Sequence, residues 1–183
     1  MPDLARFLPL SNRPKADEAG VTSDRRRPLA AVVAEAARLL DGASVPRVDA
    51  FVREARLTDL GTVGDAAGLR AATAAIAEGR KRSTKALARA VRALLLLADE
   101  VGETPRIDGT TLGIVSLYGA TAAPLERRAV IQGHALRATD AEWEFGRGPA
   151  LEGTALDIAR FVLAVSDVPP RPAAPRPAGD PSS

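Results

Sequence analysis

Arg128-Ala-Val-Ile-Gln-Gly-His-Ala-Leu-Arg-Ala-Thr-Asp140 is followed by Ala-Glu-Trp-Glu-Phe145, then by Gly-Arg-Gly-Pro149 and Ala-Leu-Glu-Gly-Thr-Ala-Leu-Asp157. This stretch holds the only tryptophan (Trp143) and the only histidine (His134) of the chain. Residues 129–139 are predicted to form one strand and residues 142–145 a second, because charged and aromatic side chains alternate there with the period of a β-strand. The stretch therefore predicts a β-hairpin with Trp143 and Phe145 on one face, where we expect them to belong to the core.

A final helix and a tail are predicted after the hairpin. Thr154 and Asp157 have the spacing of a capping box, and this box opens an apolar helix that reaches Val165. Six prolines fall between Pro169 and Pro181. A segment of this composition has no apolar surface to bury, so residues 169–183 are predicted to form a disordered tail.

Helical periodicity dominates the chain before residue 103. Apolar residues recur every three to four positions in about four segments, which are predicted to be helices within residues 29–102. The segments are Leu29 to Leu40, a second after Ser44 and Pro46, a third from a capping box of Thr62 and Asp65 to Glu78, and a fourth from Lys81 to Val101. Residues 1–28 show no period and are predicted to be an irregular arm. The apolar run 112–118 fits a helix as well as a strand.

The predicted fold class is therefore α+β. A mostly helical N-terminal region (29–102) precedes a small α+β module (110–168) with a β-hairpin and a closing helix. At 183 residues, the chain suits one domain, or one domain with a small companion. Aromatic residues make up only 3% of the chain, so leucine, valine, isoleucine and alanine must build most of the core.

The composition also indicates where in the cell the protein is expected. The chain has no cysteine, which excludes disulfides, cysteine-ligated zinc and a thiol nucleophile. Residues 1–10 lack the basic start and long apolar core of a signal peptide. The longest apolar run, Ala93–Ala98, is much shorter than the roughly 20 residues that span a bilayer. We therefore expect a cytoplasmic protein that has no membrane partner.

The strongest electrostatic feature is the segment Arg80–Arg92, which carries six positive charges and no acidic residue although the chain's net charge is only +2. Such a segment can neutralise phosphates and give weak, salt-sensitive binding to nucleic acid. The segment does not lie in a helix-turn-helix pattern, which a recognition helix normally requires. The candidate nucleic-acid-binding residues are Lys81, Arg82, Lys85, Arg89 and Arg92.

The sequence contains no catalytic constellation. A metal site needs three or more converging ligands, and His134 has no neighbouring histidine or cysteine. Nucleophile-elbow, Walker and dinucleotide patterns are all absent, so we predict no catalytic residue, no metal and no cofactor. Arg137, His134 and Trp143 are the candidate ligand-binding residues, although an ion pair between Arg137 and Asp140 or Glu142 is also expected.

Leu136-Arg-Ala-Thr-Asp140 with Trp143, Gly146-Arg-Gly-Pro149 and Leu151-Glu-Gly-Thr-Ala-Leu-Asp157 together resemble the C-terminal domain of the mycothiol-dependent maleylpyruvate isomerase family. The resemblance covers residues 110–168. It implies a C-terminal α/β domain beside an N-terminal DinB-like four-helix bundle, which in that family carries a divalent metal on histidines and a carboxylate. Residues 29–101 contain no histidine. The chain thus departs from the family at the metal site, and neither isomerase activity nor use of a thiol cofactor is expected.

Three functions follow as hypotheses. The first is a non-catalytic relative of this family that acts as a binding module for a small molecule or a protein. The second is a basic helical protein associated with nucleic acid. The third is an isomerase-like enzyme that has lost its metal site.

Overall fold

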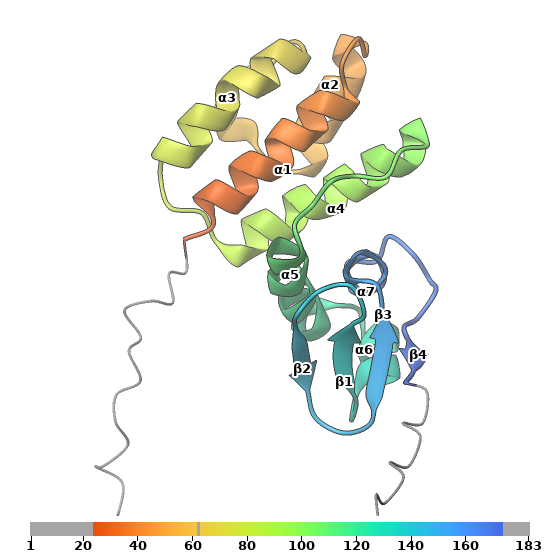
Figure 1. Cartoon of the computed structure of the whole chain (residues 1–183). Helices are drawn as coiled ribbons and strands as arrows, with labels where there is room; N and C mark the ends of the chain where they lie inside the picture. Colours follow the sequence, from red (N-terminus) through yellow and green to blue (C-terminus); the bar gives the residue numbers. More distant parts are fainter. Residues whose placement is uncertain (1–23, 62, 174–183) are drawn as a thin grey trace, which may run out of the picture.

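The computed structural model describes residues 24–61 and 63–173 of the chain. This part contains seven α-helices, one short 3-10 helix and a four-stranded sheet, so the predicted α+β class with a mostly helical N-terminal region is confirmed. Helices α1 to α4 gather at one end of the molecule, and the sheet lies with α5, α6 and α7 at the other end (Figure 1). The helices are α1 (Arg26–Leu39), α2 (Val45–Glu54), η3 (Thr58–Leu60), α3 (Ala66–Glu78), α4 (Thr84–Val101), α5 (Gly109–Ala122), α6 (Leu125–Ile131) and α7 (Ala155–Val162). The strands are β1 (Ala135–Ala138), β2 (Glu144–Gly146), β3 (Ala150–Gly153) and β4 (Arg171–Pro172).

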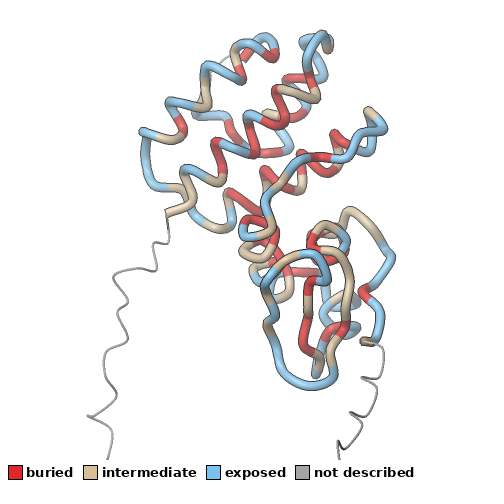
Figure 2. Tube along the Cα trace, in the orientation of Figure 1, coloured by how far each residue is buried: buried red, intermediate tan, exposed pale blue. Residues whose placement is uncertain are grey.

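Helix α4 packs against helices at both ends of the molecule. It contacts α1, α2 and α5, and it buries a stripe of alanine, leucine and valine side chains along its length. Its first turn is capped by Ser83, whose hydroxyl oxygen accepts a hydrogen bond from the Ala86 N–H at 3.2 Å. Buried positions recur along α1 and α4 and continue into β1 (Figure 2). The core is therefore continuous from the helical region into the module.

Three predicted helix starts need correction. The fourth helix begins at Thr84, after the N-cap Ser83, rather than at Lys81. Helix α1 begins at Arg26 rather than at Leu29, because the Asp24 carboxylate accepts hydrogen bonds from the Arg26 backbone N–H at 3.1 Å and from its Nε at 2.7 Å. Helix α3 is capped by Asp65 itself, which accepts from the Gly68 N–H at 2.7 Å. Asp65 therefore takes the N-cap position rather than the acidic position of a capping box, and Thr62 lies outside the described residues, as do residues 1–23 of the predicted arm.

The structure of the module corrects two further predictions and decides one that the sequence left open. The first three residues of the predicted strand 129–139 belong to helix α6, and β1 is only four residues long. Residues 112–118 are helical within α5, whose first turn is capped by Asp108 through the Thr111 N–H at 2.7 Å. The predicted tail begins too early, because Arg171 and Pro172 form β4 beside β3. Residues 174–183 of the predicted tail lie outside the described residues.

The sheet has the order β2-β1-β3-β4. The predicted hairpin is confirmed: β1 pairs antiparallel with β2, with Leu136 opposite Phe145. Strand β3, which was not predicted, pairs parallel with β1 on its other side, with Leu136 opposite Leu151. The loop from β2 to β3 therefore passes around the start of β1, as Figure 1 shows.

Two glycines make this loop possible. Gly146 and Gly148 have φ angles of +102° and +106°, which L side chains rarely adopt. A Cβ atom on Gly146 would lie 2.6 Å from the His134 carbonyl oxygen, and one on Gly148 would meet the carbonyl oxygen of Gly133. Glycine is therefore required at both positions for the loop to pass the start of β1.

Polar contacts join the two ends of the molecule at helix α7. Arg160 on α7 forms an ion pair with Asp99 on α4 at 2.6 Å. Arg92 on α4 donates from Nε to the Leu163 carbonyl oxygen at 3.2 Å, at the C-terminal end of α7. Arg127 on α6 donates to the carbonyl oxygens of Phe161 and Ser166 at 2.8 and 2.5 Å. The C-terminal end of α7 thus receives arginines from both sides.

Glu35 on α1 is a buried carboxylate that should make the fold sensitive to acid. Its oxygens accept two hydrogen bonds from Arg38, both at 2.9 Å, and one from the Arg106 N–H at 2.8 Å. Burial raises the pKa of Glu35, but the hydrogen bonds and charges of Arg38 and Arg106 outweigh that effect, so the net pKa is lowered. Such a group stabilises the fold above the pKa of the unfolded chain, about 4.3, and loses this contribution as pH falls through the folded-state pKa.

We therefore expect Glu35→Gln to lower stability at pH 7 and to weaken the acid dependence of stability below about pH 4.3. Thermal melting between pH 3 and 7 measures both effects. The matched control is Glu100→Gln, which changes an exposed glutamate near the end of α4. Parallel pH curves for wild type and Glu35→Gln would contradict the assignment.

Candidate functional site

Helix α5 is apolar around most of its circumference. One side is buried against α4 and α7 and includes Leu112 and Val115. The opposite side carries Leu117, which is 52% exposed although it lies in the middle of the helix. Leu125 at the start of α6 is 72% exposed beside it. Large apolar side chains that cluster in the open on a small protein commonly mark an interaction site.

Two adjoining hollows follow this exposed side of α5. The first has a volume of about 690 Å³ and the second about 480 Å³, and both are lined by Leu117 and Phe145. We call these two hollows together the α5 groove. Its apolar floor and walls consist of Gly113, Ile114, Leu117, Leu125, Trp143 and Phe145.

Trp143 forms one wall of the α5 groove. Its Nε1–H donates to the Gly109 carbonyl oxygen at 3.0 Å, and its ring stacks on Phe145 with the centroids 5.6 Å apart. Gly113 lets the ring lie directly on α5, since a Cβ atom there would be 2.9 Å from Trp143 Cδ1. Trp143 is half-buried, so the expectation that it belongs to the core is met on one side of the ring only. The rest of the ring is accessible from the groove.

The two ends of the α5 groove differ in charge. Asp140, Glu142 and Glu144 line the end near Trp143. Arg128 and His134 line the other end. The Asp140 carboxylate already accepts a hydrogen bond from the Ala155 N–H, and Glu144 lies beside Arg137 on the other face of the sheet. A bound molecule would therefore meet Glu142 beside the tryptophan and a cation at the far end.

His134 is half-buried at the start of β1. Its Nδ1 lies 3.1 Å from the Gln132 carbonyl oxygen, which accepts a hydrogen bond when Nδ1 carries the proton. That contact orients the ring, and His134 lines the second hollow. The structure thus brings His134 and Trp143, two of the three predicted ligand-binding residues, to the same groove through Phe145.

Arg137, the third of these residues, lies on the other face of the sheet. Its Nη2 pairs with Glu152 on β3 at 2.6 Å, and its Nε lies 3.9 Å from Glu144 on β2. Glu152 is in turn opposite Arg171 on β4. These residues form a row of alternating charge across the four strands. Arg137 therefore stabilises the outer face of the sheet, and its partners are Glu152 and Glu144 rather than the expected Asp140 or Glu142.

The five basic residues proposed for nucleic acid do not form one free cationic face. Arg82 is largely buried and pairs with Asp59 at 2.6 Å, and this hydrogen bond lowers the pKa of the Asp59 carboxyl group. Arg92 pairs with Glu54 as well as with the end of α7. Lys81 and Lys85 are exposed, whereas Arg89 is half-buried. Two of the five cations are thus already used within the fold.

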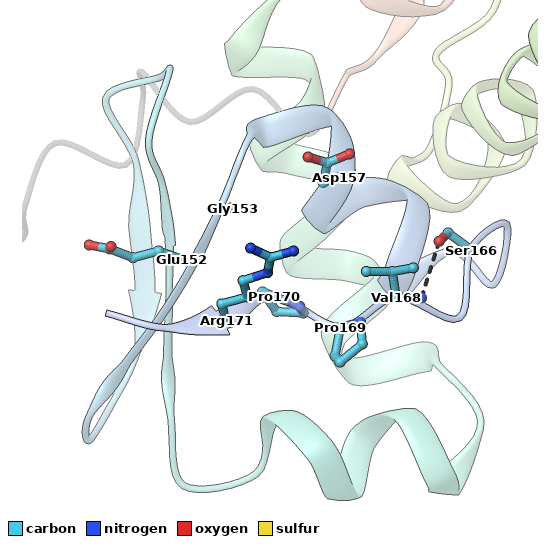
Figure 3. A pocket seen from close by; sticks show the side chains of 8 residues that line it. All are labelled: Glu152, Gly153, Asp157, Ser166, Val168, Pro169, Pro170 and Arg171. Carbon is cyan, nitrogen blue, oxygen red and sulfur yellow. Dashed lines mark hydrogen bonds between the residues drawn. The ribbon is translucent and has the colours of Figure 1, made fainter. Parts of the chain in front are cut away.

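A further hollow of about 450 Å³ lies between β3, the first turn of α7 and residues 166–171 (Figure 3). Three of its four polar side chains, those of Glu152, Asp157 and Ser166, have partners within the fold. Asp157 accepts from the Thr154 hydroxyl at 2.7 Å, and Ser166 Oγ accepts from the Val168 N–H at 3.2 Å. In Figure 3, Glu152 points away from the other labelled side chains. These groups do not converge on one point, so the hollow offers no arrangement for catalysis.

Within residues 24–61 and 63–173, no group of three or more histidine, aspartate or glutamate side chains is placed to hold a metal ion. No helix in the described part of the chain is long and apolar enough to cross a bilayer. No family model, curated protein or solved structure matches this chain. The resemblance to the maleylpyruvate isomerase family therefore stays a prediction.

Sequence reasoning missed the aliphatic part of the α5 groove. Leu117 and Leu125 look like ordinary core residues in the sequence, and only the structure shows that they are exposed. One signal was present in the run 112–118, which has no polar side if it is helical. A short helix that is apolar on every side must either be surrounded by protein or leave apolar surface open.

Proposed function

We propose that this protein is a non-catalytic binding module that holds an apolar segment of a partner protein in the α5 groove. The observation that supports this proposal most directly is the exposure of Leu117 between the Trp143–Phe145 stack and Leu125. The proposal retains the suggested kinship with the C-terminal domain of the maleylpyruvate isomerase family, and a cytoplasmic location.

The shape of the groove favours a protein segment over a small molecule. Small-molecule sites are usually concave and enclose most of their ligand. The α5 groove instead follows a helix of 14 residues, which is about 21 Å long, and two hollows succeed each other along it. An amphipathic helix laid in such a groove buries side chains at i, i+3, i+4 and i+7.

The charge of the groove further defines the partner. Glu142 lines the end near Trp143, so the partner segment should carry a basic residue next to its apolar ones. Arg128 at the other end favours an acidic or neutral group there.

A synthetic 14-residue peptide of leucine and lysine, with the leucines at i, i+3, i+4 and i+7, tests this proposal. Trp143 is the only tryptophan of the chain, so its fluorescence reports the groove directly. Titration should give a saturable blue shift with a Kd on the order of 1–100 µM. A peptide with glutamate in place of lysine should bind more weakly because of Glu142 at that end of the groove.

Leu117→Glu should weaken peptide binding at least about tenfold, because it places a charge in the apolar floor of the groove. Val45→Glu is the matched control, since Val45 on α2 is also 52% exposed and lies outside the groove. Equal affinities of wild type and Leu117→Glu, or no spectral change with the leucine–lysine peptide, would overturn the proposal.

A further inference from the structure

We infer that a hollow at the junction of α4, α5 and α7 is a second binding site, and that it takes a small organic anion, a carboxylate or phosphate group on a hydrocarbon body of about four to six carbons. The hollow shares no lining residue with the α5 groove, so the inference goes beyond the proposed function and does not depend on it. Helices α4, α5 and α7 meet where the two ends of the molecule join (Figure 1).

One side of this hollow is cationic. Lys85, Arg89 and Arg92 line it, and they stand at i, i+4 and i+7 on α4, the positions that share one side of a helix. None of the described residues that line the hollow is acidic. Along the chain, the nearest carboxylates on either side of this segment are Glu78 and Asp99. Like charges at i and i+4 repel each other, so this side of α4 would be stabilised by a bound anion.

The fold balances the charge of Arg92 but not that of its two neighbours. Arg92 Nε donates to the Leu163 carbonyl oxygen at 3.2 Å, and the guanidinium pairs with Glu54. Within residues 24–61 and 63–173, neither Lys85 nor Arg89 forms an ion pair. Arg89 is half-buried, and a cation that loses water without gaining a partner costs free energy. An anion in the hollow would offset that cost.

The rest of the lining is largely apolar, so the anion should carry a hydrocarbon body. The buried apolar residues of the lining are Ala88, Ala123, Val162 and Leu163. The hollow has a volume of about 190 Å³. This is about six times the share of one molecule in liquid water, which is too small for a peptide helix or a whole nucleotide. A guanidinium group binds a carboxylate or a phosphate through paired hydrogen bonds, so either head group fits the cationic side.

Tyr118 provides a specific probe of the hollow, because it lines the hollow and is the only tyrosine of the chain. Protein that carries 3-fluorotyrosine therefore has a single fluorine resonance. Titration of the full chain with hexanoate or monobutyl phosphate should shift this resonance saturably, with a Kd on the order of 0.1–1 mM. The emission of Trp143, which reports the α5 groove, should not change. The tighter of the two ligands identifies the preferred head group, and binding of neither would overturn the inference.

Three further ligands separate the two parts of the anion. Acetate and inorganic phosphate supply the charge without the hydrocarbon body, and hexanol supplies the body without the charge. Each should bind at least about tenfold more weakly than the better of the two complete ligands. If acetate or inorganic phosphate bound equally well, the apolar lining would have no role. If hexanol bound equally well, the cations would have none, and either result would overturn the inference.

Arg89→Gln should weaken binding of hexanoate or monobutyl phosphate about tenfold, because it removes a charge-assisted partner of the head group. Lys81→Gln is the matched control. It removes one positive charge from the same basic segment, but Lys81 is exposed and does not line the hollow. Its affinity should stay within about twofold of the wild type, since exposed charges at a distance are screened by salt.

Ala122→Phe tests the apolar part of the site and leaves all three cations in place. Ala122 is exposed near the end of α5 and lines the hollow, so the larger side chain should occupy the hollow and abolish binding. Thr121→Phe is the control, because Thr121 is the adjacent exposed residue and does not line the hollow. Thermal melting of both variants checks that the fold is retained.

The outcomes separate this inference from the proposed function. Equal affinities of wild type and Arg89→Gln, or equal losses in Arg89→Gln and Lys81→Gln, would overturn the anion site. A ligand that changes the Trp143 emission but not the fluorine resonance would also overturn it, because the ligand would then lie in the α5 groove. The leucine–lysine peptide should bind wild type and Arg89→Gln alike. If that peptide binds to no variant while hexanoate still shifts the Tyr118 resonance, the proposed function fails and the anion site stands.

Discussion

Replacing Leu94 by alanine should lower the free energy of unfolding by about 2–5 kcal/mol. The Leu94 side chain is fully buried in the middle of α4, the helix that contacts α1, α2 and α5. The substitution removes apolar contacts and leaves a cavity in the continuous core, which the surrounding helices can close only in part. Urea denaturation followed by circular dichroism measures this loss.

Leu96→Ala is the control. It makes the same leucine-to-alanine change on the same helix, so it has the same effect on helix propensity. Leu96 lies two residues away on the same helix and is half-buried, so its replacement should cost clearly less. Equal losses for the two variants would show that α4 is not packed as described.

Arg127→Ala should be the second strongly destabilising change, at roughly 2–4 kcal/mol. The Arg127 guanidinium donates to the carbonyl oxygens of Phe161 and Ser166, pairs with Asp167, and lies over the Phe161 ring at 5.2 Å. Alanine would leave the carbonyl groups at the C-terminal end of α7 without these donors, and it would remove a cation from the negative end of that helix. Thermal and urea unfolding measure the effect.

Arg128→Ala is the matched control, because Arg128 is the next residue of α6 and is exposed. It should change stability by no more than about 0.5 kcal/mol. Arg127→Lys should fall between the two, since lysine keeps the charge but cannot reach several acceptors with a rigid fork. If Arg127→Ala were as stable as Arg128→Ala, the cap on α7 would be refuted.

Local chemistry explains why much of the fold could be predicted. Helices α1 to α4 follow from the spacing of apolar residues, and the hairpin from the alternation of residues 142–145. The capping box at Thr154 is also as predicted: its Oγ1 accepts from the Asp157 N–H at 3.1 Å. Each of these signals lies within a short segment of the sequence. It can be recognised without knowing which distant residues the segment contacts.

The elements that were missed depend on distant contacts. Residues 125–131 form a helix of only seven residues, too short for a reliable period, and their β-branched residues resemble a strand. Strand β3 has four residues, and its strand character comes from pairing with β1 and β4. Strand β4 consists of Arg171 and Pro172 and lies at the edge of the sheet, where it pairs with β3.

The same reasoning applies to the α5 groove. His134 and Trp143 were found because each occurs once in the chain. Arg137 was grouped with them because it is near in sequence, but the side chain of a strand residue changes face with every position. Leu117 was missed because exposure depends on which side of α5 the other helices cover, and the sequence does not state that.

The arrangement at the end of α7 has a consequence for cooperativity. Its carbonyl oxygens receive Arg92 from the helical region and Arg127 from the module, while Arg160 on the same helix returns an ion pair to Asp99 on α4. If the helical region (α1 to α4) separated from the module, carbonyl oxygens and charges of α7 would lose their partners. The two halves should therefore unfold together as one thermodynamic unit, and a boundary drawn between them would separate regions that depend on each other for stability.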